Sequence, residues 1–89
     1  MTSSERREAV QLAVKELRTR LGLSQSALAW RLGLSIGTIH RYEHYSPPKG
    51  GMLAKFYNCA KDTGHVDLAT LFRESLITEL DLDNGELVQ

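Results

Sequence analysis

The feature that most constrains the fold is a run over residues 24–42 whose serines and glycine stand where two short helices must meet. Ser24 and Ser35 each precede an apolar pattern of helical spacing, so each hydroxyl is expected to accept from a backbone N–H of a first helical turn. Gly33 lies between them and can adopt positive φ at no steric cost, which ends the first helix in a sharp turn. Ala29 is expected to face the second helix, because a larger side chain would push the two axes apart. The run therefore predicts two short helices that cross at a steep angle.

Apolar residues recur at steps of three and four along most of the chain, and no long stretch has the alternation of a strand. This periodicity predicts five helices and an all-α fold. Gly22 is expected to stop the first helix, which spans residues 5–21, and Pro47 and Pro48 break the chain after the second short helix. The residues expected to face inward are Val10, Ala13, Val14, Leu17, Leu21, Leu28, Ala29, Leu32, Ile39, Tyr42, Met52, Leu53, Phe56, Tyr57, Ala60, Leu68, Leu71, Phe72, Leu76, Ile77 and Leu80.

The ends of the remaining helices carry weaker signals. Thr2 and Glu5 have the spacing of a capping box, but the polar residues around them fit a frayed helix end equally well. Gly64 is the expected C-cap of the fourth helix and Asp67 the expected N-cap of the fifth. Residues 81–89 lose the regular pattern, so we expect them to form an acidic C-terminal tail.

The chain has 89 residues, 42% of them hydrophobic, which fits one small domain that we place at residues 1–80. Its formal net charge is zero, but the charge is unevenly divided. Residues 1–61 hold ten Lys/Arg against four Asp/Glu, whereas residues 62–89 hold one against seven. A phosphate-facing surface is therefore compatible with the neutral total, because the local field governs binding.

Several classes of protein are not expected. No apolar run approaches the roughly 18 residues that span a bilayer, and the first residues lack the apolar stretch of a secretory signal, so we expect a cytoplasmic protein without membrane contact. Cys59 is the single cysteine, and no Cys/His cluster has zinc spacing, so neither a metal nor a cofactor is expected. His40 and His44 are four residues apart but lack a third ligand, which favours a solvent-facing pair. Nucleophile elbows, phosphate loops and paired carboxylates are absent, which argues against an enzyme.

Over about residues 9–73 the chain resembles the Cro and phage-repressor type of helix-turn-helix protein. The matching residues are Leu17-Arg18, Gly22-Leu23-Ser24-Gln25, Leu28-Ala29, Leu32-Gly33-Leu34-Ser35, Thr38-Ile39, Tyr42-Glu43, Leu53-Ala54-Lys55 and Leu68-Ala69-Thr70-Leu71-Phe72. The resemblance implies a five-helix bundle, the lambda-repressor-like DNA-binding domain, with its motif at about residues 24–44. It also implies that the chain binds double-stranded DNA and regulates transcription, as a repressor of bacterial or phage origin.

In such proteins the second helix of the motif enters the major groove, and the first helix lies over the backbone. The resemblance therefore implies that Gln25 bonds a phosphate through its side chain and backbone N–H, and that Lys49 reaches a flanking phosphate. The implied groove-facing residues are Ser35, Ile36, Gly37, Thr38, His40 and Arg41.

Two of these positions depart from the family's pattern. Ile36 and Gly37 stand where relatives often carry polar, base-reading side chains. An isoleucine packs on a thymine methyl, whereas glycine offers no readout. Much of the discrimination then falls on Thr38, His40 and Arg41, with a contribution from DNA shape.

Two further features leave alternatives open. Arg18 and Glu43 stand where the family frequently shows a charged pair. The resemblance therefore implies an ion pair that fixes the second helix of the motif, the recognition helix. The alternative is two unpaired surface charges. Trp30 is not a core position of its helix and is either a rim residue or part of a partner surface. The alternative function is therefore a protein-interaction module, antitoxin-like or regulator-binding, that uses Trp30 or the acidic tail.

The apolar residues Leu76, Ile77, Leu80 and Leu82 lie beyond the end of the resemblance. We expect a homodimer that uses this part of the fifth helix, because a single recognition helix touches too few base pairs to select a site in a genome. The alternative is that these residues close the core of the monomer.

Overall fold

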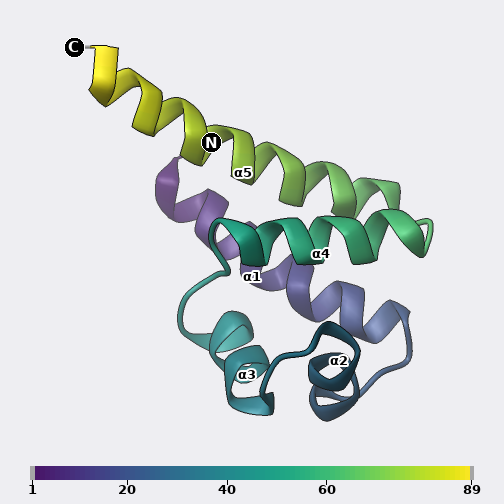
Figure 1. Cartoon of the computed structure of the whole chain (residues 1–89). Helices are drawn as coiled ribbons and strands as arrows, with labels where there is room; N and C mark the ends of the chain where they lie inside the picture. Colours follow the sequence, from purple (N-terminus) through teal and green to yellow (C-terminus); the bar gives the residue numbers. More distant parts are fainter. Residues whose placement is uncertain (1, 89) are drawn as a thin grey trace. The chain divides into compact units, whose positions relative to one another are not determined.

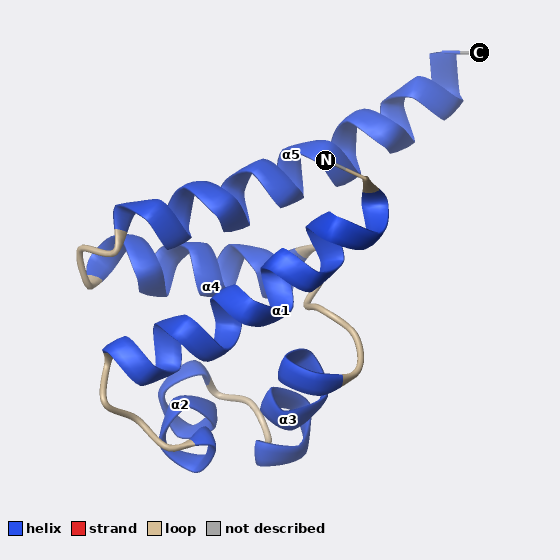
Figure 2. Ribbon diagram, turned by 180° about the vertical axis from the view of Figure 1, so that it is seen from behind, coloured by secondary structure: helices blue, strands red, loops and turns tan. Residues whose placement is uncertain are grey.

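The computed structural model describes the backbone of residues 2–88 and the side chains of residues 2–80. Within this described part the chain forms helices and loops and no strand (Figure 2). The helices are α1 (Ser3–Arg20), α2 (Gln25–Leu32), α3 (Ile36–His44), α4 (Gly51–Asp62) and α5 (Val66–Val88) (Figure 1). The predicted all-α class with five helices is therefore confirmed. The chain divides into two compact units, residues 1–48 with α1 to α3 and residues 49–89 with α4 and α5.

The three helices of the first unit each begin at a hydroxyl cap. Thr2, Ser24 and Ser35 each accept a hydrogen bond from the backbone N–H three residues further on, at 3.2, 3.0 and 3.1 Å. The caps at Ser24 and Ser35 are those predicted from the sequence. At the N-terminus the capped helix, rather than the frayed end, is the form observed, and α1 starts at Ser3. Each cap satisfies one backbone donor that the helix itself leaves without a partner.

The turn between α2 and α3 is made by Gly33, as predicted. Its φ of 69° lies in the left-handed region, and its backbone N–H donates to the carbonyl oxygens of Ala29 and Trp30. The next N–H, that of Leu34, donates to the Ala29 carbonyl oxygen at 2.8 Å. These three bonds close α2 at Gly33, and α3 starts three residues after that glycine.

The core of the first unit is built from one face of each helix. The buried apolar residues are Val10, Ala13, Val14, Leu17, Leu28, Ala29, Ile39 and Tyr42. Helix α3 packs against both α1 and α2. Leu21 and Leu32, which were expected inside, are only half-buried, because they stand at the C-terminal ends of their helices, where fewer side chains surround them.

In the second unit, α4 and α5 lie side by side and run in opposite directions (Figure 1). Their buried apolar residues are Leu53, Phe56, Cys59, Ala60, Leu68, Ala69 and Phe72. The rings of Phe56 and Phe72 are 5.6 Å apart between centroids. The expected core positions that lie at or beyond the edge of the core are the half-buried Met52, Tyr57, Leu71 and Leu76 and the exposed Ile77 and Leu80.

The boundaries of α4 and α5 differ from the predicted ones. Thr63, not Gly64, is the C-cap of α4, and Gly64 follows it with a φ of 81°. Helix α5 begins at Val66, so Asp67 lies inside its first turn and is not the cap. A carboxylate there still favours the helix, because it faces the positive end of the helix dipole.

Helix α5 continues to Val88, so the backbone of residues 81–88 is helical. The expectation that these residues lack regular structure was wrong. Adding residues to an existing helix costs much less than starting one, and no proline interrupts the segment. The expected acidic tail and the side chain of Leu82 lie outside the residues whose side chains the structure describes.

One contact in the second unit has no signal in the local sequence. Gly50, which precedes α4, has no side chain to cap that helix, and its backbone N–H donates to the carboxylate of Glu79, 3.3 Å from each oxygen. Glu79 belongs to α5, so this acid caps the neighbouring helix and fixes the start of α4 against α5.

Two glycines of the first unit give a matched test of the turn. Gly33→Ala is expected to lower the free energy of unfolding by about 1–2 kcal/mol, because alanine at this positive φ is strained. Gly37→Ala is the control: Gly37 has helical φ, and an added Cβ would meet only the Ser35 hydroxyl, at 3.9 Å. This change is expected to raise stability by about 0.5–1 kcal/mol. Urea unfolding followed by circular dichroism measures both, and equal effects would contradict the role given to Gly33.

Candidate nucleic-acid interface

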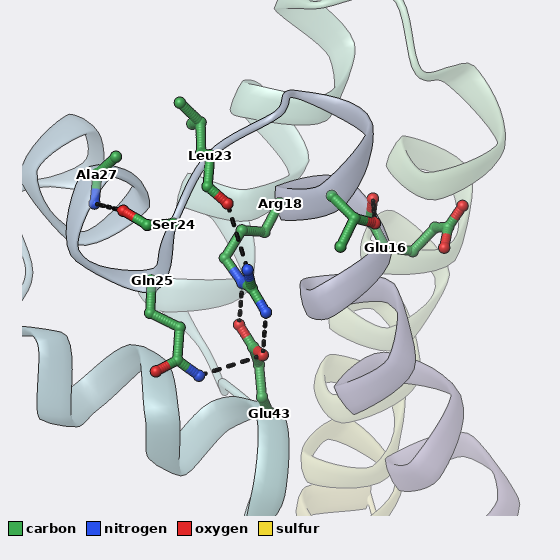
Figure 3. Close-up of polar contacts among 8 residues, drawn as sticks. Glu16, Arg18, Leu23, Ser24, Gln25, Ala27 and Glu43 are labelled. Carbon is green, nitrogen blue, oxygen red and sulfur yellow. Dashed lines mark hydrogen bonds and ion pairs between the residues drawn. The ribbon is translucent and has the colours of Figure 1, made fainter.

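A buried polar cluster joins the three helices of the first unit (Figure 3). Arg18, near the end of α1, donates from Nε to Oε2 of Glu43 at 2.8 Å and from Nη2 to Oε1 at 3.0 Å. Its Nη1 donates to the carbonyl oxygen of Leu23 at 3.2 Å. Gln25, the first residue of α2, donates from Nε2 to Oε1 of Glu43 at 3.3 Å. Glu43 lies near the end of α3, so one carboxylate connects α3 to both α1 and α2.

Burial and charge act in opposite directions on this carboxylate. The side chain of Glu43 has no exposed surface, and that of Arg18 is 17% exposed. Burial alone raises the pKa of Glu43, but the hydrogen bonds from Arg18 and Gln25 and the positive charge of Arg18 outweigh it, so the pKa lies below its ordinary value. The hydrogen bond to Glu43 raises the pKa of Arg18. Both groups are therefore charged at neutral pH, and the predicted ion pair is confirmed.

Gln25 makes a contact inside the protein that the sequence did not indicate. Its carboxamide was expected to face a phosphate, yet in the structure it is half-buried and bonds Glu43. A carboxamide nitrogen carries two hydrogens, and the bond to Glu43 uses one of them. The second remains for an acceptor outside the protein. Sequence reasoning missed the Gln25–Glu43 contact because the two residues are 18 positions apart.

The other predicted groove residues share α3 and its cap. Ile39, Tyr42 and Glu43 are the buried residues of this helix. Ile36, at 54% exposure, is accessible, as are Ser35, Gly37, His40 and Arg41, while Thr38 is half-buried. The structure therefore brings six of the eight predicted site residues onto one short segment, which begins at Ser35.

The second half of α3 carries basic side chains. The guanidinium of Arg41 lies 5.5 Å from the centroid of the Tyr42 ring. The rings of His40 and His44 are 4.5 Å apart, and the His40 ring is 5.8 Å from that of Tyr45. No group of three or more metal-ligating side chains occurs among the residues that the structure describes. The two exposed histidines thus have the solvent-facing arrangement expected for them.

Lys49 and Trp30 do not belong to this segment. Lys49 is exposed and begins the second unit, where its carbonyl oxygen accepts from the backbone N–H of Met52 at 3.1 Å. Trp30, on α2, is 87% exposed, which confirms that it is not a core residue. An exposed indole is a surface on which a partner could bury apolar area.

Comparison with known proteins identifies the motif. A family model described as a helix-turn-helix domain matches residues 12–44, a span that begins inside α1 and ends with the last residue of α3. Comparison with curated proteins and with solved structures gave no match. Residues 12–44 therefore match a helix-turn-helix domain, within a chain whose described part is all-α. None of the helices, over the residues described, is both long and apolar enough to cross a membrane.

The Arg18–Glu43 pair can be tested by a double-mutant cycle. Arg18→Ala and Glu43→Ala are each expected to lower the free energy of unfolding by about 3 kcal/mol, because each leaves a buried charge without its partner. The double variant should cost clearly less than the two changes added together.

The matched control is the exposed pair Glu16 and Arg20 on α1, four residues apart with 2.9 Å between Oε1 and Nε. Its coupling energy is expected to be about 0.5 kcal/mol or less, since water screens both charges. Thermal or urea unfolding gives both couplings. Equal couplings for the buried and the exposed pair would refute the structural role assigned to Glu43.

Proposed function

We propose that this chain is a sequence-specific double-stranded DNA-binding regulator of transcription, a repressor of bacterial or phage origin, with α3 as its recognition helix. The observation that carries the proposal is the division of charge on α3. Its one acid, Glu43, is buried and neutralised by Arg18, while His40 and Arg41 are exposed. The accessible side of the helix is therefore neutral or basic, as binding in a phosphate-lined groove requires.

The helix pair supplies the remaining contacts. In the proposed complex α3 lies in the major groove, and α2 lies over the backbone with its first residue toward a phosphate. Gln25 donates its second carboxamide hydrogen to that phosphate, and the bond to Glu43 holds the amide in place. Lys49 supplies a flanking phosphate contact. Binding involves no cofactor and no catalytic step, and it takes place in the cytoplasm.

A protein-interaction module is the second candidate, favoured by the 87% exposure of Trp30. An antitoxin-like or regulator-binding protein of this kind would bury the indole, or use the acidic C-terminal segment, against a partner protein. Salt separates the two functions. Binding to DNA phosphates weakens steeply as salt rises, whereas an apolar contact centred on tryptophan changes little.

The DNA-binding proposal predicts a specific loss for Arg41→Ala. A preferred duplex, taken from selection on random-sequence DNA, should bind the variant more weakly by about 1–3 kcal/mol, with relaxed discrimination at one base pair if Arg41 contacts a guanine. Equal loss on every sequence would mark a phosphate contact instead. The matched control is Arg7→Ala, an exposed arginine in the first turns of α1, which lie apart from α2 and α3 (Figure 2). Failure of the wild-type protein to bind any duplex at low salt would refute the proposal.

We also propose that the regulator acts as a homodimer on an inverted-repeat site, with the two recognition helices about one DNA turn apart. Exposed apolar side chains on α5 support this: Ile77 is 42% exposed and Leu80 is 54% exposed, and residues three apart share one side of a helix. Leu76, next to Ile77, is half-buried. A single short helix contacts too few base pairs to select one site in a genome, and a dimer would double that number.

The dimer is tested in the full-length chain by Ile77→Glu. The wild-type protein is expected to sediment as a dimer at micromolar concentration and the variant as a monomer, because a buried unpaired carboxylate opposes association. Val66→Glu is the control, since Val66 is 70% exposed at the other end of α5. A wild-type monomer, or equal effects of the two substitutions, would count against a dimer through this surface.

A further inference from the structure

We propose that Ile36 recognises the methyl group of a thymine, so that the first turn of α3 selects a T·A pair. The inference rests on the proposed DNA-binding function and names the chemistry that one turn of the recognition helix reads. It starts from the groups that this turn presents to solvent.

The hydroxyl groups of the first turn already take part in hydrogen bonds within the helix. Ser35 Oγ accepts from the backbone N–H of Thr38 at 3.1 Å and lies 2.8 Å from Thr38 Oγ1, so one of the two hydroxyls donates to the other. Their positions are set by capping the helix. Thr38 is, in addition, half-buried. These two residues therefore have little freedom to turn toward a base edge.

The accessible side chain of the turn that makes no hydrogen bond is a hydrocarbon one. Ile36 is the first residue of α3 and is 54% exposed, so burying it against another apolar group would be favourable. Gly37, beside it, has no side chain, and the only atom within 4 Å of a Cβ built there is Ser35 Oγ, at 3.9 Å. The turn therefore presents one apolar side chain next to an open stretch of backbone.

The major groove offers only one hydrocarbon group that matches this surface. Each base pair presents hydrogen-bond donors and acceptors there, and among the four bases only thymine adds a methyl, at C5. Against any other base edge, Ile36 would remove water from polar atoms without replacing their hydrogen bonds. Isoleucine is also stiff at χ1 in a helix, so little side-chain entropy is lost when it packs on the methyl.

The rest of α3 points to DNA, and not to an apolar partner surface, as the occupant. His40 and Arg41 are exposed on the next turn, and a protein that covered Ile36 would also have to cover these polar groups. In a groove they face phosphates and guanine acceptors. The helix is thus divided along its length, with an apolar first turn for a methyl and a basic second turn for polar or charged groups.

The test removes the methyl and nothing else. In the preferred duplex obtained by selection on random-sequence DNA, each thymine is replaced in turn by deoxyuridine, which keeps the base pair and lacks the C5 methyl. Wild-type protein is expected to lose about three- to tenfold in affinity at one thymine of each half-site, the range expected for burial of a methyl-sized group against a side chain. Ile36→Ala is expected to bind the unmodified duplex more weakly and to be indifferent to that deoxyuridine, while Ile36→Val retains part of the sensitivity.

Each outcome decides the proposal. If wild-type protein binds the selected duplex but no deoxyuridine weakens it, methyl recognition is overturned and DNA binding stands. A loss that persists unchanged in Ile36→Ala also overturns it, because the methyl then acts through DNA shape. No binding to any duplex at low salt overturns DNA binding and methyl recognition together. Because Ile36 is exposed, Ile36→Ala is expected to fold, circular dichroism checks this, and the scan with wild-type protein alone tests the proposal in any case.

Discussion

The helix-turn-helix depends on the buried carboxylate of Glu43. A charge with no exposed surface is tolerated only when other groups neutralise it and satisfy its hydrogen bonds, and here Arg18 and Gln25 do both. The two-point geometry of the guanidinium allows few orientations of the carboxylate. Such a pair adds little net stability compared with well-packed apolar residues in its place, but its geometry restricts the relative orientation of the groups that it joins. Its contribution is therefore to fix how α3 lies against α1 and α2, and so which side of α3 is exposed.

The same cluster accounts for the way a neutral chain presents a basic surface. The chain carries eleven Lys/Arg and eleven Asp/Glu, so the total charge predicts no affinity for DNA. Within α3, however, the acid is turned inward and cancelled, while His40 and Arg41 point out to solvent. Most of the remaining acids lie after residue 61. What matters for a groove-binding surface is this local separation of charge along the chain, and not the sum.

The sequence predicted the contacts between residues close together in the chain and missed most of those between distant residues. The caps at Ser24 and Ser35 and the turn at Gly33 involve residues three or four positions apart, and each was correctly predicted. The Arg18–Glu43 pair spans 25 positions and became visible only through the family resemblance. The Gln25–Glu43 and Gly50–Glu79 bonds were missed, because contacts over 18 and 29 positions leave no local pattern. The extent of α5 was underestimated because helix propagation tolerates residues of low propensity once a helix exists.

Gln25 belongs both to the scaffold and to the candidate interface, and this couples the two. One carboxamide hydrogen bonds the carboxylate that orients α3, and the other is available at the start of α2, where the proposed phosphate contact lies. A phosphate bound there would fix the position of α2 on the DNA backbone. The bond from Gln25 to Glu43 would then fix the position of α3 relative to that phosphate. The position of Ile36 and Arg41 over the base edges is then set by the same side chain that meets the backbone. In the proposed complex, the residue that would bind DNA without regard to sequence would therefore determine where the sequence-reading residues lie.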